Sequence, residues 1–137
     1  MEIYELFERP ELERPVLVLA LDGWIDAGLA ASGASLALQD ELETVTVARF
    51  DPDILLDYRA RRPTVHMVDG VMRGLSWPST ELHAATDLAG NELLLLIGSE
   101  PDRSWNSFVD AVVQLALDFE VSMCVGLGAY PAPAPHT

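Results

Sequence analysis

The sequence predicts one α/β domain over residues 1–137, a three-layer sandwich with a mostly parallel sheet and a β-hairpin insert. Two observations favour this class. Short continuous apolar runs alternate with helical patterns at both ends of the chain, which is typical of β-α-β units. Between them, two β-branched runs meet at an Asp-Gly pair, which indicates a hairpin. A chain of 137 residues can bury one proper hydrophobic core.

The first β-α-β unit is expected near the amino terminus. Residues 1–15 are charged and contain two prolines, which indicates an irregular or edge-pairing arm. Residues 16–21 form an apolar run that predicts a strand buried on both faces. Asp26 is placed to cap a helix over residues 27–39, whose many small residues would let it lie close to the sheet. The β-branched residues 43–50 predict the next strand.

The middle of the chain predicts a short helix, a hairpin and one further strand. The Asp-Pro pair at 51–52 favours a helix that ends near Arg59. Residues 64–68 and 71–77 predict two strands joined by an Asp-Gly turn. Residues 81–86 are a weaker candidate strand.

The last part of the chain repeats the first pattern. A strand over 92–97, a helix over 103–119 and a strand over 121–126 are expected, followed by an extended Pro-rich tail over 130–137. On a helical wheel the apolar residues of this helix fall within an arc of about 80°. They are Trp105, Phe108, Val112, Leu115 and Phe119, with Asp110, Gln114 and Asp118 opposite.

Composition argues against several classes of protein. The 22 acidic residues against eight basic ones, all Arg, give a net charge of −14, which disfavours nucleic acid or an anionic membrane as a partner. No apolar run reaches the length of a membrane helix, and the acidic amino terminus differs from a signal peptide. With a single cysteine and no zinc-like spacing, we expect no metal and no cofactor, and a cytoplasmic location.

Three loops leave the carboxyl ends of the predicted parallel strands, at residues 22–26, 98–105 and 127–136. In α/β sheets ligands bind beyond these ends, so we expect the loops to form one concave binding crevice. Its candidate residues are Asp22, Trp24, Asp26, Glu100, Arg103, Trp105 and His136. Since acidic groups outnumber the one cation, the crevice favours an uncharged or cationic ligand, or a basic peptide.

Each of these residues also has a simpler structural explanation. Asp26 can cap the helix that follows it, and Asp22 can lie in a turn with Gly23. Glu100 and Arg103 can form an ion pair beside a helix cap. These roles are alternatives to a shared crevice.

The motifs give little support to catalysis. Gly126-Leu-Gly128 follows a predicted strand, but the Pro-rich segment after it cannot open a helix over a pyrophosphate. The sequence contains no nucleophile elbow and no HExxH motif. His66 is expected to be a packed or edge residue, His83 to be exposed, and Cys124 to be an inert core thiol. No residue is therefore assigned a catalytic role.

A set of short motifs occurs in order along nearly the whole chain: Leu21-Asp-Gly-Trp-Ile-Asp-Ala-Gly28, Phe50-Asp-Pro-Asp53 with Asp57-Tyr58, Arg62-Pro63, Asp69-Gly70, Trp77-Pro78, Glu100-Pro101 with Arg103-Ser-Trp105, Gly126-Leu-Gly-Ala129, and Pro135-His136-Thr137. Together they resemble the proteasome assembly chaperone two family, especially its actinobacterial members. The resemblance implies a three-layer α/β sandwich, similar in fold to phosphorylases and peptidyl-tRNA hydrolases. It also implies relatives that act as chaperones for proteasome α subunits, and bacterial members that form homo-oligomers, trimers among them.

Members of that family continue beyond the Pro-His-Thr motif, so the chain resembles their amino-terminal part and is expected to be incomplete relative to them. The resemblance favours a non-catalytic protein-binding module, chaperone-like or scaffolding, whose partner is another protein or a second copy. The alternative is a small-molecule-binding or hydrolase/phosphorylase-like enzyme that uses the same crevice. An uncovered sheet edge would also favour self-association, despite the charge of −14.

Overall fold

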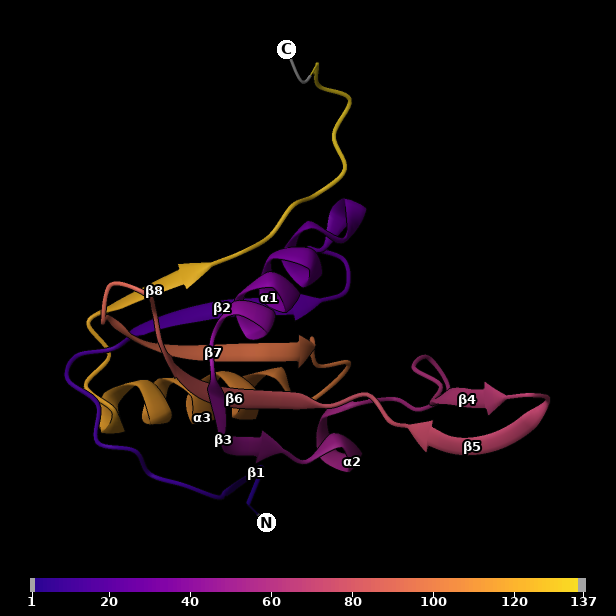
Figure 1. Ribbon diagram of the computed structural model, residues 1–137, viewed down its shortest axis with the longest axis horizontal. Coiled ribbons are helices and arrows are strands. Elements are labelled where there is room, and N and C mark those ends of the chain that lie inside the picture. Colours follow the sequence, from indigo (N-terminus) through magenta and orange to yellow (C-terminus); the bar gives the residue numbers. More distant parts are fainter. Residues whose placement is uncertain (1, 136–137) are drawn as a thin grey trace.

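Over residues 2–135, which the computed structural model describes, six strands form one mixed sheet (Figure 1). They are β1 (Tyr4–Leu6), β2 (Val16–Asp22), β3 (Thr44–Phe50), β6 (Thr80–Thr86), β7 (Glu92–Ser99) and β8 (Met123–Gly126). The strand order across the sheet is β1-β3-β6-β7-β2-β8. The predicted strands near residues 16–21, 43–50, 81–86 and 92–97 are confirmed, and β1 pairs at the edge.

The pairing places β2 between two parallel neighbours, β7 and β8. The pairs β7–β6, β6–β3 and β3–β1 are antiparallel, so β2, β3, β7 and β8 all run in one direction. The α/β fold class is thus confirmed as a mixed sheet with helices. The weakest predicted strand, β6, lies near the middle of the sheet because it separates β3 from β7.

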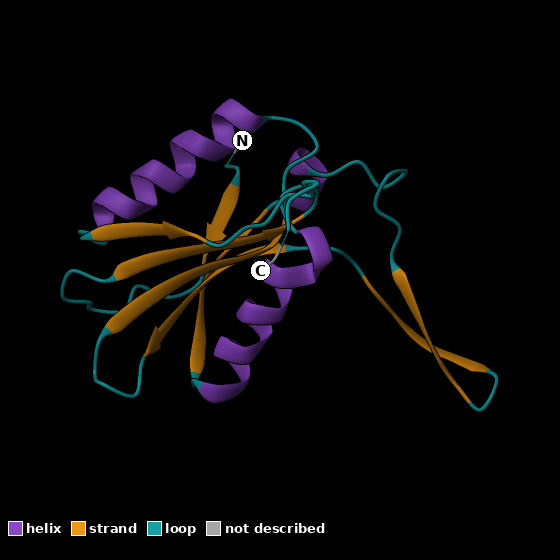
Figure 2. Ribbon diagram, turned by 90° about the horizontal axis from the view of Figure 1, so that it is seen from above, coloured by secondary structure: helices purple, strands orange, loops and turns teal. Residues whose placement is uncertain are grey.

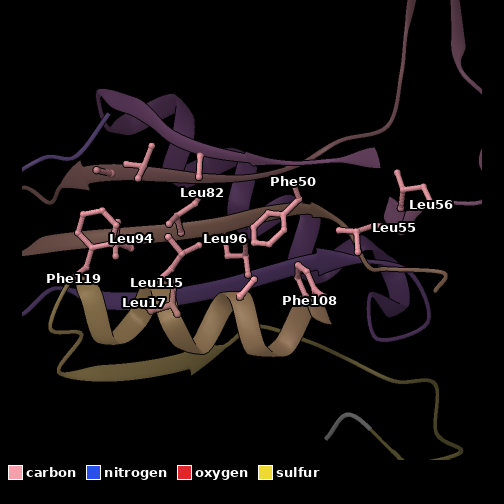
Figure 3. Close-up of a cluster of buried hydrophobic side chains, with 14 residues drawn as sticks. Leu17, Phe50, Leu55, Leu56, Leu82, Leu94, Leu96, Phe108, Leu115 and Phe119 are labelled. Atoms are coloured by element: carbon pink, nitrogen blue, oxygen red, sulfur yellow. The ribbon is translucent and has the colours of Figure 1, made fainter. Parts of the chain in front are cut away.

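Two helices lie on opposite faces of the sheet, as Figure 2 shows: α1 (Ala30–Glu41) and α3 (Trp105–Asp118). The larger core lies between the sheet and α3, where Phe108 and Leu115 point toward Leu17, Leu94 and their neighbours (Figure 3). A smaller cluster on the other face joins Leu38 and Leu42 to Ala85 and Leu95. The apolar face predicted for α3 is confirmed, except that Trp105 at its start is half exposed.

The start of α1 differs from the predicted helix over 27–39. Residues Ala27–Leu29 form a 3-10 turn, and α1 begins only at Ala30 because Gly28 and Leu29 adopt left-handed backbone angles that a right-handed helix does not contain. Asp26 still caps the helix, since its Oδ1 accepts from the amides of Ala31 (2.8 Å) and Ser32 (3.1 Å). Of the small residues expected to lie against the sheet, Ala31 is fully buried, whereas Gly28, Ala30, Gly33, Ala34 and Ala37 are exposed.

The helix predicted from Asp51 to about Arg59 is shorter than expected. Asp51 caps it, but α2 spans only Pro52–Leu55. The reason is that the carbonyl oxygen of Leu55 accepts from the amides of Asp102 and Arg103, so it is not available to a further helical turn.

The predicted hairpin is confirmed as β4 (Thr64–Val68) and β5 (Val71–Ser76). Asp69 and Gly70 both have positive φ, 50° and 76°, as the two-residue turn of a twisted hairpin requires. The hairpin forms a separate two-stranded sheet and projects away from the six-stranded one (Figures 1 and 2). His66 lies on this hairpin and is exposed.

Two predictions of solvent exposure are wrong. Cys124 is exposed, because β8 is the outer strand and its residues are uncovered within the described part of the chain. His83 is largely buried rather than exposed, with its Nε2 3.0 Å from Glu81. No helix in residues 2–135 combines the length and the apolar character needed to cross a lipid bilayer.

Replacement of Phe108 tests the packing of α3. Its ring is 4% exposed and lies 4.9 Å from that of Phe50, so Phe108→Ala leaves a large cavity. We expect the free energy of unfolding to fall by about 3–5 kcal/mol, measured by urea denaturation. The exposed Gln114 on the same helix is the control, and Gln114→Ala should change it by no more than about 0.5 kcal/mol. Equal losses in the two variants would contradict the assigned helix face.

The carboxylate of Asp26 makes the stability of the protein depend on pH. The Ser32 hydroxyl, followed by the Ser32 and Ala31 amides, holds the pKa of Asp26 below its usual value. A lowered folded-state pKa stabilises the protein above the unfolded pKa of about 4, and that stability is lost as pH falls through the folded pKa. Asp26→Ala should therefore lower the melting temperature at neutral pH, and the difference from wild type should shrink in acid.

The exposed Asp40 on α1 provides the matched comparison. Asp40→Ala should show a smaller difference at neutral pH, measured by circular dichroism. A loss that is the same at every pH in the Asp26 variant would rule out the charged cap.

Candidate functional site

One arginine joins the loops that follow the parallel strands. Arg61 Nη1 donates to Asp22 at the end of β2 (3.2 Å), and its Nε donates to Asp102 after β7 (3.1 Å). Its Nη2 donates to the carbonyl oxygen of Glu100 (3.1 Å). The Arg61 side chain is only 20% exposed, so these bonds lie partly out of water. The carboxyl ends of β2 and β7 are thereby tied to the segment that precedes the hairpin.

Arg61 was not among the residues predicted for the site. The available signal was that Arg59, Arg61 and Arg62 form the only basic cluster in a strongly acidic chain. This cluster does not follow a parallel strand, so the rule that ligands bind at strand ends overlooked it. Asp102, the second carboxylate on Arg61, lies within the predicted loop at residues 98–105 but was not named among the site residues.

The loop after β2 presents an aromatic side chain beside this network. The amide of Trp24 donates to Oε1 of Glu100 (3.2 Å). Gly23 allows this approach, because its φ is 137° and a Cβ there would lie 2.3 Å from the Glu100 carboxyl group. The Trp24 side chain is 72% exposed and stacks on Tyr130, with ring centres 6.4 Å apart and planes 4° apart.

The third loop meets the first through its backbone. The amide of Ala27 donates to the carbonyl oxygen of Ala129 (3.0 Å). The amide of Ala129 in turn donates to the carbonyl oxygen of Ile25 (2.6 Å). Segments 22–27, 98–102 and 127–130 therefore lie together at one end of the sheet. Among the predicted residues, Asp22, Trp24 and Glu100 share this region.

The other predicted residues have different positions. Asp26 is buried and serves as the cap of α1, which agrees with its structural explanation. Arg103 does not pair with Glu100: its Nη2 donates to the carbonyl oxygens of Asp53 (3.0 Å) and Leu56 (2.6 Å), on the side of α2. Trp105 packs edge-on against Phe108 at the start of α3. His136 lies outside the described residues.

Two side chains next to this region, Asp26 and Tyr58, have shifted pKa values. The lowered pKa of Asp26 keeps that carboxyl group ionised. A hydrogen bond to Asp53 (2.6 Å) raises the pKa of Tyr58 to about 12, so its hydroxyl stays protonated. Within residues 2–135, no group of three or more His, Cys, Asp or Glu side chains is placed to hold a metal ion.

A polar groove of about 400 Å³ lies between α1 and the sheet. Its lining includes Asp22 and Gly98 at the ends of β2 and β7, together with Gln39, Glu81 and His83. Sequence reasoning could have found His83, because it lies between Leu82 and Ala84 in an alternating strand and so faces the side of α1. The groove therefore extends the strand-end region onto that face of the sheet.

Several solved structures are similar to this chain. A protein of unknown function from Corynebacterium glutamicum is 36% identical, with a TM-score of 0.90 over 98% of this chain and 52% of that one. A Mycobacterium tuberculosis protein of unknown function is 42% identical, with a TM-score of 0.89 over 98% of this chain and 49% of that one.

A second Mycobacterium tuberculosis protein, described as a proteasome-assembly chaperone homologue, is 33% identical. Its TM-score is 0.79, over 89% of this chain and 52% of that one. The chain thus spans about half the length of each of these three proteins. Among functionally curated proteins no relative was found.

The sequence itself matches the model of one protein family over residues 20–137, which include α1, α2, α3, the β4–β5 hairpin and the strand-end loops. With identities above 30% to structures that share the fold over nearly the whole chain, this match shows that the chain belongs to the PAC2 family.

Proposed function

We propose that this chain is a non-catalytic protein-binding module of the proteasome-assembly chaperone type. Its membership of the PAC2 family supports this role, as does its similarity to a mycobacterial protein described as a proteasome-assembly chaperone homologue. The proposed binding surface is the strand-end region around Trp24. A cytoplasmic location is part of the proposal, and the single unpaired cysteine suits it.

The observation that carries the proposal is the exposed aromatic pair. Trp24 is 72% and Tyr130 is 67% exposed, and the two rings stack in parallel. Large aromatic side chains are enriched at the centres of protein interfaces, where their burial contributes much of the binding energy. Stacking also fixes both rings before a partner arrives, which reduces the entropy lost on binding.

The charges around the pair favour a basic partner. Asp22, Glu100 and Asp102 share the single guanidinium of Arg61, so negative charge remains beside the aromatic pair. The chain as a whole carries a net charge of −14, which repels acidic proteins and attracts basic ones. A basic segment with apolar side chains therefore fits this surface best. The partner can also be a further copy of the chain, so a homo-oligomer, a trimer included, belongs to the proposal.

The contacts of the polar side chains support binding in preference to catalysis. Asp26 caps α1 and has a lowered pKa, whereas a general acid at neutral pH needs a raised one, so Asp26 does not suit that role. The guanidinium groups of Arg61 and Arg103 are occupied by carboxylates and carbonyl oxygens. These side chains hold the loops in place, and the exposed rings remain free for a partner.

Peptides of opposite charge test the proposed surface. A labelled peptide of alternating Arg and Leu should bind more tightly than its Glu and Leu counterpart, measured by fluorescence anisotropy. Trp24→Ala should weaken binding of the basic peptide by about tenfold or more without lowering the melting temperature. Leu117→Ala, which removes an exposed apolar residue near the far end of α3, should leave the affinity unchanged.

Equal binding of the two peptides, or equal effects of the two substitutions, would contradict the proposed surface. A loss of melting temperature in the Trp24 variant would instead assign that residue a structural role. Recovery of proteasome α subunits by the wild-type chain, and not by the Trp24 variant, would support the chaperone role itself.

The alternative function is binding of a small uncharged molecule in the polar groove beside α1. It is favoured by the pairing of His83 with Glu81 (3.0 Å) on the groove lining, next to Gln39 and Ser35. None of the described residues that line the groove is Arg or Lys, which disfavours a phosphate-bearing substrate. A nucleoside that raises the melting temperature of wild type but not of His83→Ala would support this alternative. No such stabilisation by any nucleoside would leave it without support.

A further inference from the structure

A groove with an apolar lining lies along α1, between this helix and the turn at residues 87–89. It has a volume of about 850 Å³. Its apolar lining residues are Ala34, Ala37, Leu38, Leu42, Leu88, Ala89 and Leu127. Leu88, in the turn, is 91% exposed. Single exposed apolar residues are common on protein surfaces, whereas apolar residues gathered in a groove are typical of a site where another molecule binds.

The outer face of α1 is poor in charge. The first charged residue of the helix is Asp40, and the residues exposed before that point are Ala30, Gly33, Ala34, Leu36 and Ala37. A helix on the surface of a soluble protein usually presents charged side chains to water, and a helix that is apolar on all sides is usually covered. Both long helices lie on the outside of the molecule (Figure 2). The composition of α1 therefore fits a helix whose outer face is covered by a partner.

The rim of this groove is acidic. Glu41 and Asp87 line it, and Asp40 and Glu43 are exposed close to Glu41 in the sequence. None of the described residues that line the groove is Arg or Lys. Carboxylates around an apolar surface favour a partner that carries basic side chains around an apolar face of its own.

The lining favours a helical partner over an extended one. It comes from α1, the turn at 87–89 and two residues just beyond regular elements, Leu42 and Leu127, so no strand contributes to it. The groove therefore offers no row of free backbone groups with which an extended peptide could pair. A helix forms its own backbone hydrogen bonds and needs only side-chain contacts. The small side chains of Ala34 and Ala37 would let such a helix approach α1 closely.

The described helices of this chain do not suit the groove of a second copy. Helix α1 ends with Asp40 and Glu41, α3 contains Asp110 and Asp118, and neither contains Arg or Lys. Docking of either helix would bring carboxylates against the acidic rim, and like charges brought together weaken association. A helix from a different protein fits the groove better.

We propose that this apolar groove binds a basic amphipathic helix of another protein. Apolar side chains spaced three and four residues apart on that helix would pack over Leu38 and Leu88, and flanking Lys or Arg side chains would face Glu41 and Asp87. The groove follows α1 from Ala34 to Leu42, a rise of about 12 Å, so a partner helix of about three turns covers it.

This site is additional to the strand-end surface around Trp24. Neither Trp24 nor Tyr130 lines the groove. The two surfaces also differ in the partner they favour, because the groove requires apolar side chains at helical spacing. Each proposal can therefore fail while the other stands.

Designed peptides provide the first test. A labelled peptide with Leu at positions i, i+3, i+4 and i+7 of each helical repeat and Lys at the flanking positions should bind the wild-type chain in fluorescence anisotropy. A version with Pro at its centre cannot form the continuous helix and should bind at least tenfold more weakly. A version with Glu in place of Lys should also bind at least tenfold more weakly, and the affinity of the Lys peptide should fall as salt increases.

Substitutions in the groove provide the second test. Leu88→Ala should weaken binding of the helical Lys peptide by about tenfold, whereas Leu117→Ala, the same change at an exposed position of α3, should leave it unchanged. Glu41→Gln should weaken it by about threefold, and Asp110→Asn on the exposed side of α3 is the matched control. Because Leu88 and Glu41 are exposed, neither change should lower the melting temperature measured by circular dichroism.

The variant Trp24→Ala separates this site from the strand-end surface. It should bind the helical Lys peptide as tightly as wild type does, and Leu88→Ala should still bind the alternating Arg and Leu peptide. Loss of helical-peptide binding in the Trp24 variant would overturn the groove proposal. So would equal binding of the Pro or Glu version, equal effects of Leu88→Ala and Leu117→Ala, or no binding of the Lys peptide by wild type at millimolar concentration.

Discussion

The arrangement at the carboxyl end of the sheet depends on the guanidinium group of Arg61. It contacts Asp22, Asp102 and the carbonyl oxygen of Glu100, which belong to loops that follow different strands. Without this cation, carboxylates from two loops would face one another in a partly buried setting, where repulsion is poorly screened. The same contact fixes the point at which the hairpin leaves the domain. One side chain thus joins the loops beside the aromatic pair to the segment that leads into the β4–β5 hairpin.

The two faces of the sheet are covered unequally. The face under α3 holds most of the hydrophobic core, and the face under α1 keeps concave surface that could bind a ligand or partner. On the face of α3, Phe50, Phe108 and Phe119 fill a continuous core. On the face of α1 the buried cluster is small, with Leu42, Ala85 and Leu95 as its buried members. The polar groove lies beside α1, and so does the apolar groove between this helix and the turn at residues 87–89. A helix built from Ala, Gly and Ser contributes little volume, so this face keeps concave surface that a larger helix would fill.

Local signals in the sequence predicted most elements correctly. These signals are local, because a few neighbouring residues decide whether a segment forms a strand, a turn or an amphipathic helix. Examples are the apolar run at 16–21, the Asp-Gly turn and the pattern around Phe108. Errors arose where distant segments compete. The predicted helix after Pro52 stops early because the Leu55 carbonyl binds amides near residue 102, and Cys124 is exposed because no described strand lies beyond β8. Strand order and the role of Arg61 depend on such long-range contacts, which no local pattern contains.

Gly23 and Trp24 are neighbours with opposite constraints. Gly23 combines a φ of 137° with a Glu100 carboxyl group where any Cβ would lie, while the indole of Trp24 extends into solvent. In a saturation mutagenesis library, selection for folding alone would therefore disfavour substitutions at position 23, mainly because a φ of 137° strains a residue with a Cβ. Position 24 would tolerate broad substitution under that selection and would narrow only when growth or capture required the partner. Two adjacent codons can thus report separately on folding and on recognition in a single experiment.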